Sequence, residues 1–162
     1  MNRRPRERFS LTLITAVLVS AFVASSVRAA SWNGIQTFKS RREEVIKILG
    51  SPIAETSEGV LRFAVAGGSV AVSFASEKFV AAKKLKPQVA GTVLEIVLQH
   101  EHSSDTPESL KLLQNRDFVR EDSQSVSIFR SNKTGVVYTF VNGVLRTTRF
   151  TASETELARA RR

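Results

Sequence analysis

The first regular pattern of apolar positions along the chain has a helical period. Residues 45–49 supply an apolar stripe on one side of a short segment rich in helix formers. Ser40 suits the N-cap position, and Glu43 three residues later completes a capping box. Gly50 and Pro52 end the pattern, because glycine adopts the left-handed cap and proline cannot continue a helix. We therefore expect a helix from Ser40 to Gly50.

The pattern then changes to a period of two. Large apolar residues alternate with small or polar ones from Gly59 to Phe74, with Gly67-Gly68 at the centre. This pattern predicts a β-hairpin with one face in the core. Residues 77–91 show no regular period. Five of the eight residues 92–99 are apolar and only Glu95 is charged, which favours a central strand buried on both faces, followed by a polar loop over residues 100–105.

A second helix is predicted from Thr106. Thr106 suits the N-cap, Pro107 the first helical position, and Asn115 a left-handed C-terminal cap, with three leucines between them. Residues 44–49 and 108–113 have similar residue types at corresponding positions. Either the chain contains two αββ-type repeats, or two short amphipathic helices resemble each other by chance.

Three further strands are expected, over residues 125–130, 136–141 and 144–150. Asn142-Gly143 joins the last two, and this dipeptide between alternating runs is a strong hairpin signal. From Ser153 the chain either forms one or two helical turns, with Ser153 and Glu156 forming a capping box, or frays. The whole order predicts an α+β domain: an antiparallel sheet with two short helices on one face.

The first 29 residues have the layout of a signal peptide. Four arginines precede an apolar run from Leu11 to Val23, and small residues occupy the positions before a cut after Ala29. The alternative is an uncleaved N-terminal anchor, for which the run is short, since a spanning helix needs about 20 apolar residues. We expect residues 1–29 to be the signal peptide, residues 30–151 a single domain and residues 152–162 a basic tail. This layout predicts an exported protein, periplasmic or extracellular.

Charge and cysteine content narrow the classes of function. The 162-residue chain has a formal charge of +9, but residues 31–162 contain 19 basic and 14 acidic residues, or +5. A nucleic-acid binder has a stronger and more clustered basic face, so nucleic acid is not expected as a partner, and a membrane at most peripherally. The absence of cysteine excludes disulfides, a zinc ribbon and a cysteine nucleophile.

The helix-then-hairpin segment resembles a known family. Val45, Leu49, Gly50 and Pro52, followed by the hairpin, are similar to the BamE/SmpA type of small outer-membrane assembly protein and to the tandem form of the unit in the β-lactamase inhibitor protein. The resemblance covers Ser40 to Phe74. It implies a periplasmic α+β module that binds other proteins and has no catalytic site. Many members are lipoproteins, whereas this chain has no cysteine to carry a lipid.

Candidate chemistry is sparse. His100 and His102 point to the same side of an extended strand and suit a metal site only with further ligands, so a solvated loop is the expected interpretation. The chain has no Gly-x-Ser-x-Gly turn, and Gly67-Gly68 is not followed by the residues of a phosphate loop. Several carboxylates fall at expected helix starts or loops, where the helix dipole and solvent explain them: Glu43, Glu44, Glu108, Asp117, Glu121 and Asp122. We therefore expect no catalytic, cofactor or metal site.

Three features each have two interpretations. The lysines of residues 78–86 suit a solvated loop, or contact with an anionic head group or acidic partner. The basic residues 159–162 suit a disordered tail or a tether to anionic polymers. Trp32 is expected to pack on the core, the alternative being an exposed interface residue.

The sequence thus favours an exported, non-catalytic protein-binding or structural module of the cell envelope, whose partner is another envelope protein. The alternatives are a small-molecule or lipid-binding module and an unrecognised hydrolase. A binding module requires an exposed apolar patch or an unpaired sheet edge. A ligand binder requires an enclosed pocket, and an enzyme requires titratable groups with shifted pKa values in it.

Overall fold

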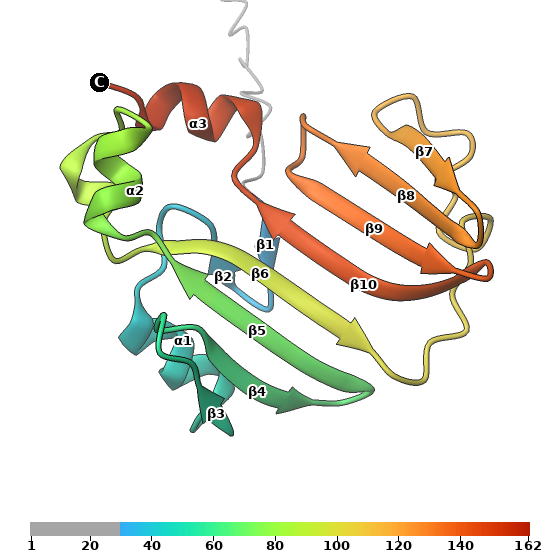
Figure 1. The fold of residues 1–162 in the computed structure, drawn as a ribbon, viewed down its shortest axis with the longest axis horizontal. Coiled ribbons are helices and arrows are strands. Elements are labelled where there is room, and N and C mark those ends of the chain that lie inside the picture. Colours follow the sequence, from blue (N-terminus) through green and yellow to red (C-terminus); the bar gives the residue numbers. More distant parts are fainter. Residues whose placement is uncertain (1–29) are drawn as a thin grey trace, which may run out of the picture.

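The structure is a computed structural model, and it describes residues 30–162 (Figure 1). The predicted signal peptide, residues 1–29, lies outside the described residues. The described chain is an α+β fold, as predicted. It contains an eight-stranded antiparallel sheet in the order β3-β4-β5-β6-β10-β9-β8-β7, a two-stranded sheet β1-β2 and three short α-helices.

The bounds of the strands are β1 (Ser31–Trp32), β2 (Ile35–Gln36), β3 (Ala54–Glu55), β4 (Leu61–Val65), β5 (Gly68–Phe74), β6 (Val93–His100), β7 (Val119–Ser123), β8 (Val126–Ser131), β9 (Val136–Val141) and β10 (Val144–Thr151). The helices are α1 (Arg42–Leu49), α2 (Glu77–Ala82) and α3 (Glu154–Ala160), with a 3₁₀ turn η1 (Pro87–Val89).

The predicted hairpins are confirmed. β4 and β5 pair antiparallel around the turn at Gly67-Gly68, and β9 pairs with β10 around Asn142-Gly143. Asn142 and Gly143 have φ values of +50° and +75°, the conformation that an Asn-Gly hairpin turn requires. β6 is central, as predicted, and joins the two halves of the sheet by pairing with β5 and β10.

Helix α1 begins one residue later than predicted. Its N-cap is Arg41, whose backbone N–H donates to the Glu44 carboxylate at 3.1 Å. Ser40 is buried, and its hydroxyl instead accepts from the backbone N–H of Gln36 at 3.2 Å. The capping box of Ser40 and Glu43 is therefore wrong by one position. The helix ends at Gly50, as predicted, with a φ of +84°.

The second predicted helix is wrong. Residues 107–111 and 113–114 form turns, and Lys111 adopts a φ of +55°, outside the right-handed helical region. The start follows the cap signal, since the Thr106 hydroxyl accepts from the backbone N–H of Ser109 at 3.2 Å. Because this segment is not a helix, α1 has no helical counterpart in the second half, which favours the second alternative, a chance resemblance of two short segments.

Three elements carried no clear sequence signal. The strand β7 is exposed at every position and has no apolar face, so it shows no alternation. Helix α2 is only six residues long, and the hydroxyl of Ser76 caps it by accepting from the backbone N–H of Phe79 at 3.1 Å. The turn η1 is shorter still.

One face of the large sheet is covered. Helix α1 and the β1-β2 pair lie over β4 to β6, and residues 102–118 lie over β8 to β10. The first core consists of Ile35, Val45, Leu61, Phe63, Val70, Val72, Val93 and Ile96, with Trp32 packed against it as expected. The second consists of Leu112, Phe129, Phe140 and Leu145. Figure 1 looks onto the other face of the sheet, with α1 behind the strands.

The chain beyond Thr151 belongs to the same fold. Ser153 caps α3 through the predicted box with Glu156, whose carboxylate accepts from the backbone N–H of Ser153 at 2.8 Å. Helix α3 sits beside α2 at one end of the sheet (Figure 1). Ala160 shares a small core with Val80 and Leu85. Of the two alternatives for this segment the helical one is confirmed, and residues 152–162 are not a separate tail.

Candidate functional site

The face of the sheet opposite α1 carries a continuous row of cross-strand neighbours. The register places one residue from each of the eight strands in this row. In strand order they are Ala54, Arg62, Ala71, Val97, Arg149, Val137, Arg130 and Val119. Side chains of directly opposed residues lie on the same side of a sheet, so the row forms one band across this open face. Three arginines alternate in it with small or branched apolar residues.

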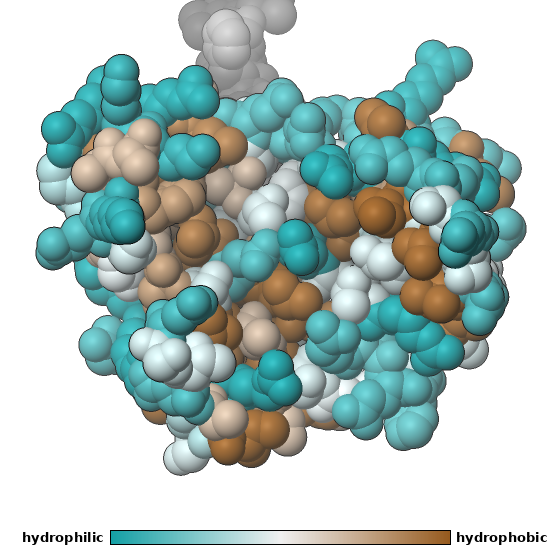
Figure 2. All heavy atoms as spheres, viewed as in Figure 1, coloured by the Kyte–Doolittle hydropathy of each residue, from teal (hydrophilic) through white to brown (hydrophobic). Residues whose placement is uncertain are grey.

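The open face is mixed, but its part formed by β8 and β9 is more apolar than a water-facing sheet usually is. β9 presents Tyr138 and Phe140 to the covered face, yet Val137 and Val141 point to the open one. A strand that is apolar on both sides is typical of a sheet covered on both faces. Val119 at the end of the row is 65% exposed. Figure 2 shows brown side chains gathered among teal ones on this face.

The open face carries charges of both signs. Arg62, Arg130 and Arg149 share it with Glu95 and Glu121, and Glu154 lines the same hollow as Arg130 and Arg149. Arg149 is paired with Glu95, at 3.2 Å between Nε and Oε1. Within residues 30–162, Arg62 and Arg130 have no ion-pair partner. This face thus offers two guanidinium groups without an ion-pair partner next to partly exposed apolar side chains.

The two edges of the sheet are poor docking sites by comparison. β7 carries Arg120, Glu121 and Asp122, and Arg120 pairs with Asp122 at 2.9 Å. At the other edge β3 is only two residues long. Short and charged edge strands are the usual protection against strand addition. The open face, rather than an edge, is therefore the candidate interaction surface.

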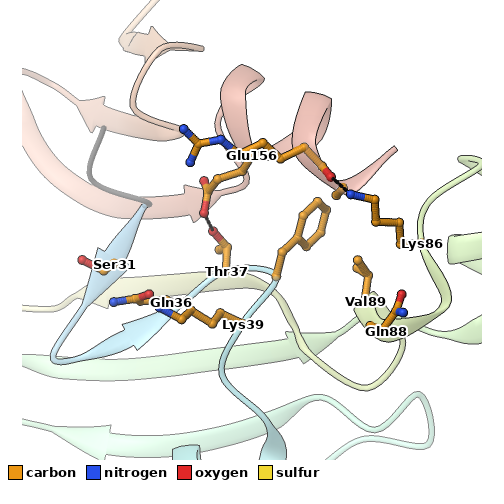
Figure 3. Close-up of a pocket in the computed structure, with 11 residues that line it drawn as sticks. Ser31, Gln36, Thr37, Lys39, Lys86, Gln88, Val89 and Glu156 are labelled. Atoms are coloured by element: carbon orange, nitrogen blue, oxygen red, sulfur yellow. Dashed lines mark hydrogen bonds between the residues drawn. The ribbon is translucent and has the colours of Figure 1, made fainter. Parts of the chain in front are cut away.

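A groove of about 720 Å³ lies beneath α3, where the β1-β2 pair meets η1 (Figure 3). Its lining is mixed, and consists of Ser31, Gln36, Thr37, Phe38, Lys39, Lys86, Gln88, Val89, Glu156, Arg159 and Ala160. Thr37 is buried, and its hydroxyl donates to the Glu156 carboxylate at 3.4 Å. The ammonium group of Lys86 donates to the backbone carbonyl of Arg159 at 2.6 Å.

The two histidines have different surroundings. His100 ends β6, and its Nε2 lies 2.9 Å from the Thr148 hydroxyl on β10, whereas His102 is exposed in the loop. Among residues 30–162 no group of three or more His, Asp or Glu side chains is arranged to hold a metal ion. Burial lowers the pKa of His100, although the negative charge of Asp105 acts to raise it. Burial also raises the pKa of Tyr138.

The predicted carboxylates have local roles where the structure shows a partner. Asp117 pairs with Lys133 at 2.9 Å. Asp122 accepts from the Ser127 hydroxyl at 2.7 Å and from Arg120, and these bonds lower its pKa. Glu44 caps α1. These contacts give each of the three carboxylates a local structural role.

The pKa of His100 predicts a pH-dependent stability. The unfolded histidine, with its pKa near 6.5, takes up a proton more readily than the folded one. The stabilising contribution is therefore complete above that value and is lost as the pH falls below it. We expect the Tm of the wild type to fall more steeply between about pH 7 and pH 5 than that of His100→Gln. The His100 side chain takes up a proton when the chain unfolds in this range, whereas a glutamine side chain does not titrate. His102→Gln is the matched control, and an identical pH profile for wild type and His100→Gln contradicts the prediction.

Neither surface was apparent from the sequence. The arginine row depends on the pairing register of eight strands, and the groove joins residues that are more than a hundred positions apart in the chain. One signal for the open face was available, namely the strand 136–141, which is apolar at nearly every position.

The function of this chain has to be inferred from the geometry of its surfaces. Within residues 30–162 no helix is long and apolar enough to cross a membrane. No protein-family model, no curated protein and no solved structure matches this chain.

Proposed function

We propose that this protein is an exported, non-catalytic protein-binding module of the cell envelope, and that the open face of its sheet docks an acidic partner protein. The single observation that carries the proposal is the band of residues across all eight strands, apolar and arginine-bearing at once. Such a band suits a protein interface, where an apolar centre and arginine side chains are enriched. The signal-peptide layout of residues 1–29 supports export.

The chemistry of the face favours an acidic partner over a second copy of the chain. Arg62 and Arg130 have no ion-pair partner within residues 30–162, and a copy stacked face to face would bring the same three arginines along with its carboxylates. An acidic surface would satisfy both guanidinium groups while covering the partly exposed valines. Arginine also binds carboxylates with two parallel hydrogen bonds, which adds orientation to the attraction.

The experiment is a site-specific crosslink within the native envelope. A photoreactive residue in place of Val137 is expected to give a covalent adduct with one acidic protein, identified by mass spectrometry. Adding Arg62→Glu and Arg130→Glu is expected to lower the adduct yield by about tenfold or more, because two charge-assisted contacts become repulsive. High salt should lower the yield as well.

Matched controls separate this surface from general charge effects. Lys111→Glu with Arg116→Glu reverses the same number of exposed charges on the segment behind the sheet and should leave the yield unchanged. A photoreactive residue at Leu113, exposed on the segment behind the sheet, should give no adduct with the same partner. An adduct with a second copy of the chain, an adduct insensitive to the arginine reversals, or no adduct at all would each overturn the proposal.

A further inference from the structure

Two basic segments that are far apart in the sequence meet at one corner of the fold. Leu85 pairs with Arg161 in an antiparallel bridge. The backbone N–H of Lys86 donates to the Ala160 carbonyl at 2.7 Å, and that of Arg162 donates to the Lys84 carbonyl at 3.1 Å. Residues 77–90 and 153–162 together hold seven basic and three acidic side chains, a net +4 out of the +5 carried by residues 31–162. Most of the excess charge of the domain is therefore concentrated here.

The groove beneath α3 opens at this corner and is itself cationic. Lys39, Lys86 and Arg159 line it from three separate segments, against the single carboxylate of Glu156. That carboxylate is already engaged, since it accepts from the Thr37 hydroxyl and from the backbone N–H of Ser153. The side chains of Lys39 and Arg159 have no hydrogen-bond or ion-pair partner within residues 30–162, so their charges are available to a bound anion.

The rest of the lining is neutral and suited to hydroxyl groups. Gln36 and Gln88 contribute amides, each able to donate and accept, and Ser31 contributes a hydroxyl. Figure 3 shows Gln36 and Lys39 side by side on one wall, with Lys86 and Gln88 at the opposite end. The lining also includes an aromatic residue, Phe38, whose φ of +57° is unusual for a bulky side chain. The backbone N–H of Phe38 donates to the Val93 carbonyl at 2.7 Å, which holds it in this conformation.

From these features we infer that the groove binds an anionic saccharide, a sugar that carries a carboxylate or phosphate group. The lysine and arginine side chains bind the anionic group, and the glutamine amides form hydrogen bonds with the ring hydroxyls. The aromatic side chain packs on the apolar face of the sugar ring. A volume of about 720 Å³ falls within the usual range of ligand sites, roughly 300–1,000 Å³. The same chemistry is presented by a free sugar acid and by an anionic glycan chain.

Isothermal titration calorimetry of the purified protein tests this inference with four probes: glucuronate, tetragalacturonate, glucose and citrate. We expect glucuronate to bind in the millimolar range and glucose, which lacks the charge, to give no measurable binding. Tetragalacturonate binding at least about tenfold more tightly than glucuronate points to a glycan chain as the ligand, and equal affinity points to a free sugar acid. Citrate should bind more weakly than glucuronate, because it lacks the ring.

The variants assign the binding to this groove. Lys39→Gln with Arg159→Gln should weaken tetragalacturonate and glucuronate binding by about tenfold or more, since both positions are exposed and lose their charge without loss of core packing. Lys111→Gln with Arg116→Gln removes the same charge at the far half of the sheet and should leave both affinities unchanged. Gln88→Leu, which keeps every charge, should also weaken binding.

Four results would each overturn the inference. These are glucose binding as well as glucuronate, citrate binding as tightly as the saccharides, equal effects of the two charge-neutralising pairs, and no binding of either acidic sugar. The inference is independent of the proposed partner protein. Arg62→Glu with Arg130→Glu should leave saccharide binding unchanged, so failure of one proposal is distinguishable from failure of the other.

Discussion

Phe140→Ala is expected to lower the free energy of unfolding by about 3–5 kcal/mol, the usual cost of removing a fully buried aromatic side chain. Phe140 is 0% exposed on β9, and its ring meets that of Phe129 edge to face, with 5.6 Å between centroids and 83° between planes. It also packs with Leu112, which belongs to the segment covering this half of the sheet. Equilibrium unfolding in urea measures the loss.

The effect should extend beyond global stability. Residues 102–118 contain no helix or strand and are held over the sheet by this core, so the variant should be cut there faster by a protease. Thr139→Ala, one residue away on the open face of the same strand, is the control and should change stability by less than about 0.5 kcal/mol. Equal losses for the two variants would contradict the assignment of Phe140 to the covered face and of Thr139 to the open one.

Gly135→Ala is expected to destabilise the fold by more than about 2 kcal/mol, because two costs add at this position. Gly135 has a φ of +72°, which disfavours any residue with a Cβ. An added Cβ would lie 2.1 Å from the backbone carbonyl oxygen of Thr151 and 3.0 Å from the backbone nitrogen of Ser153. Relief requires the end of β10 to move, which breaks the 2.7 Å bond from the Thr151 N–H to the Gly135 carbonyl.

Gly143→Ala isolates the steric part of that cost. Gly143 has nearly the same backbone conformation, with a φ of +75°, but no atom lies within 4 Å of the position that an added Cβ would take. The free energy of unfolding of Gly143→Ala should therefore fall only by the cost of the left-handed backbone conformation, about 1–2 kcal/mol. Calorimetric unfolding of the two variants measures the difference. If both lose the same amount, the close approach of β10 to Gly135 is not rigid, and α3, which begins two residues after Ala152, is not positioned by it.

Local signals in the sequence were sufficient for the hairpins and for the fold class. Asn142-Gly143 and Gly67-Gly68 are positions where the backbone conformation of a turn is inexpensive, and the period of two on either side places one face in the core. The end of α1 at Gly50 and the cap of α3 at Ser153 are local for the same reason. Each depends on a few neighbouring residues, so no tertiary information was needed.

Local signals failed where two conformations are close in energy. Thr106 and Pro107 favour the start of a helix, but residues 106–115 follow the leucine contacts of the second core and turn at Lys111 instead. Ser40 is a good N-cap residue, yet its burial beside Gln36 assigns its hydroxyl to a different backbone group. In both cases tertiary packing outweighed a preference of about 1 kcal/mol.

By itself the sequence determined the α+β class and the hairpin turns, because these depend on residue type and spacing. Only the tertiary structure decided which functional surfaces exist. The arginine row requires the register of eight paired strands, and the cationic groove requires Lys39, Lys86 and Arg159 to converge from distant parts of the chain. Register and convergence are set by long-range packing, which no local pattern of residues encodes.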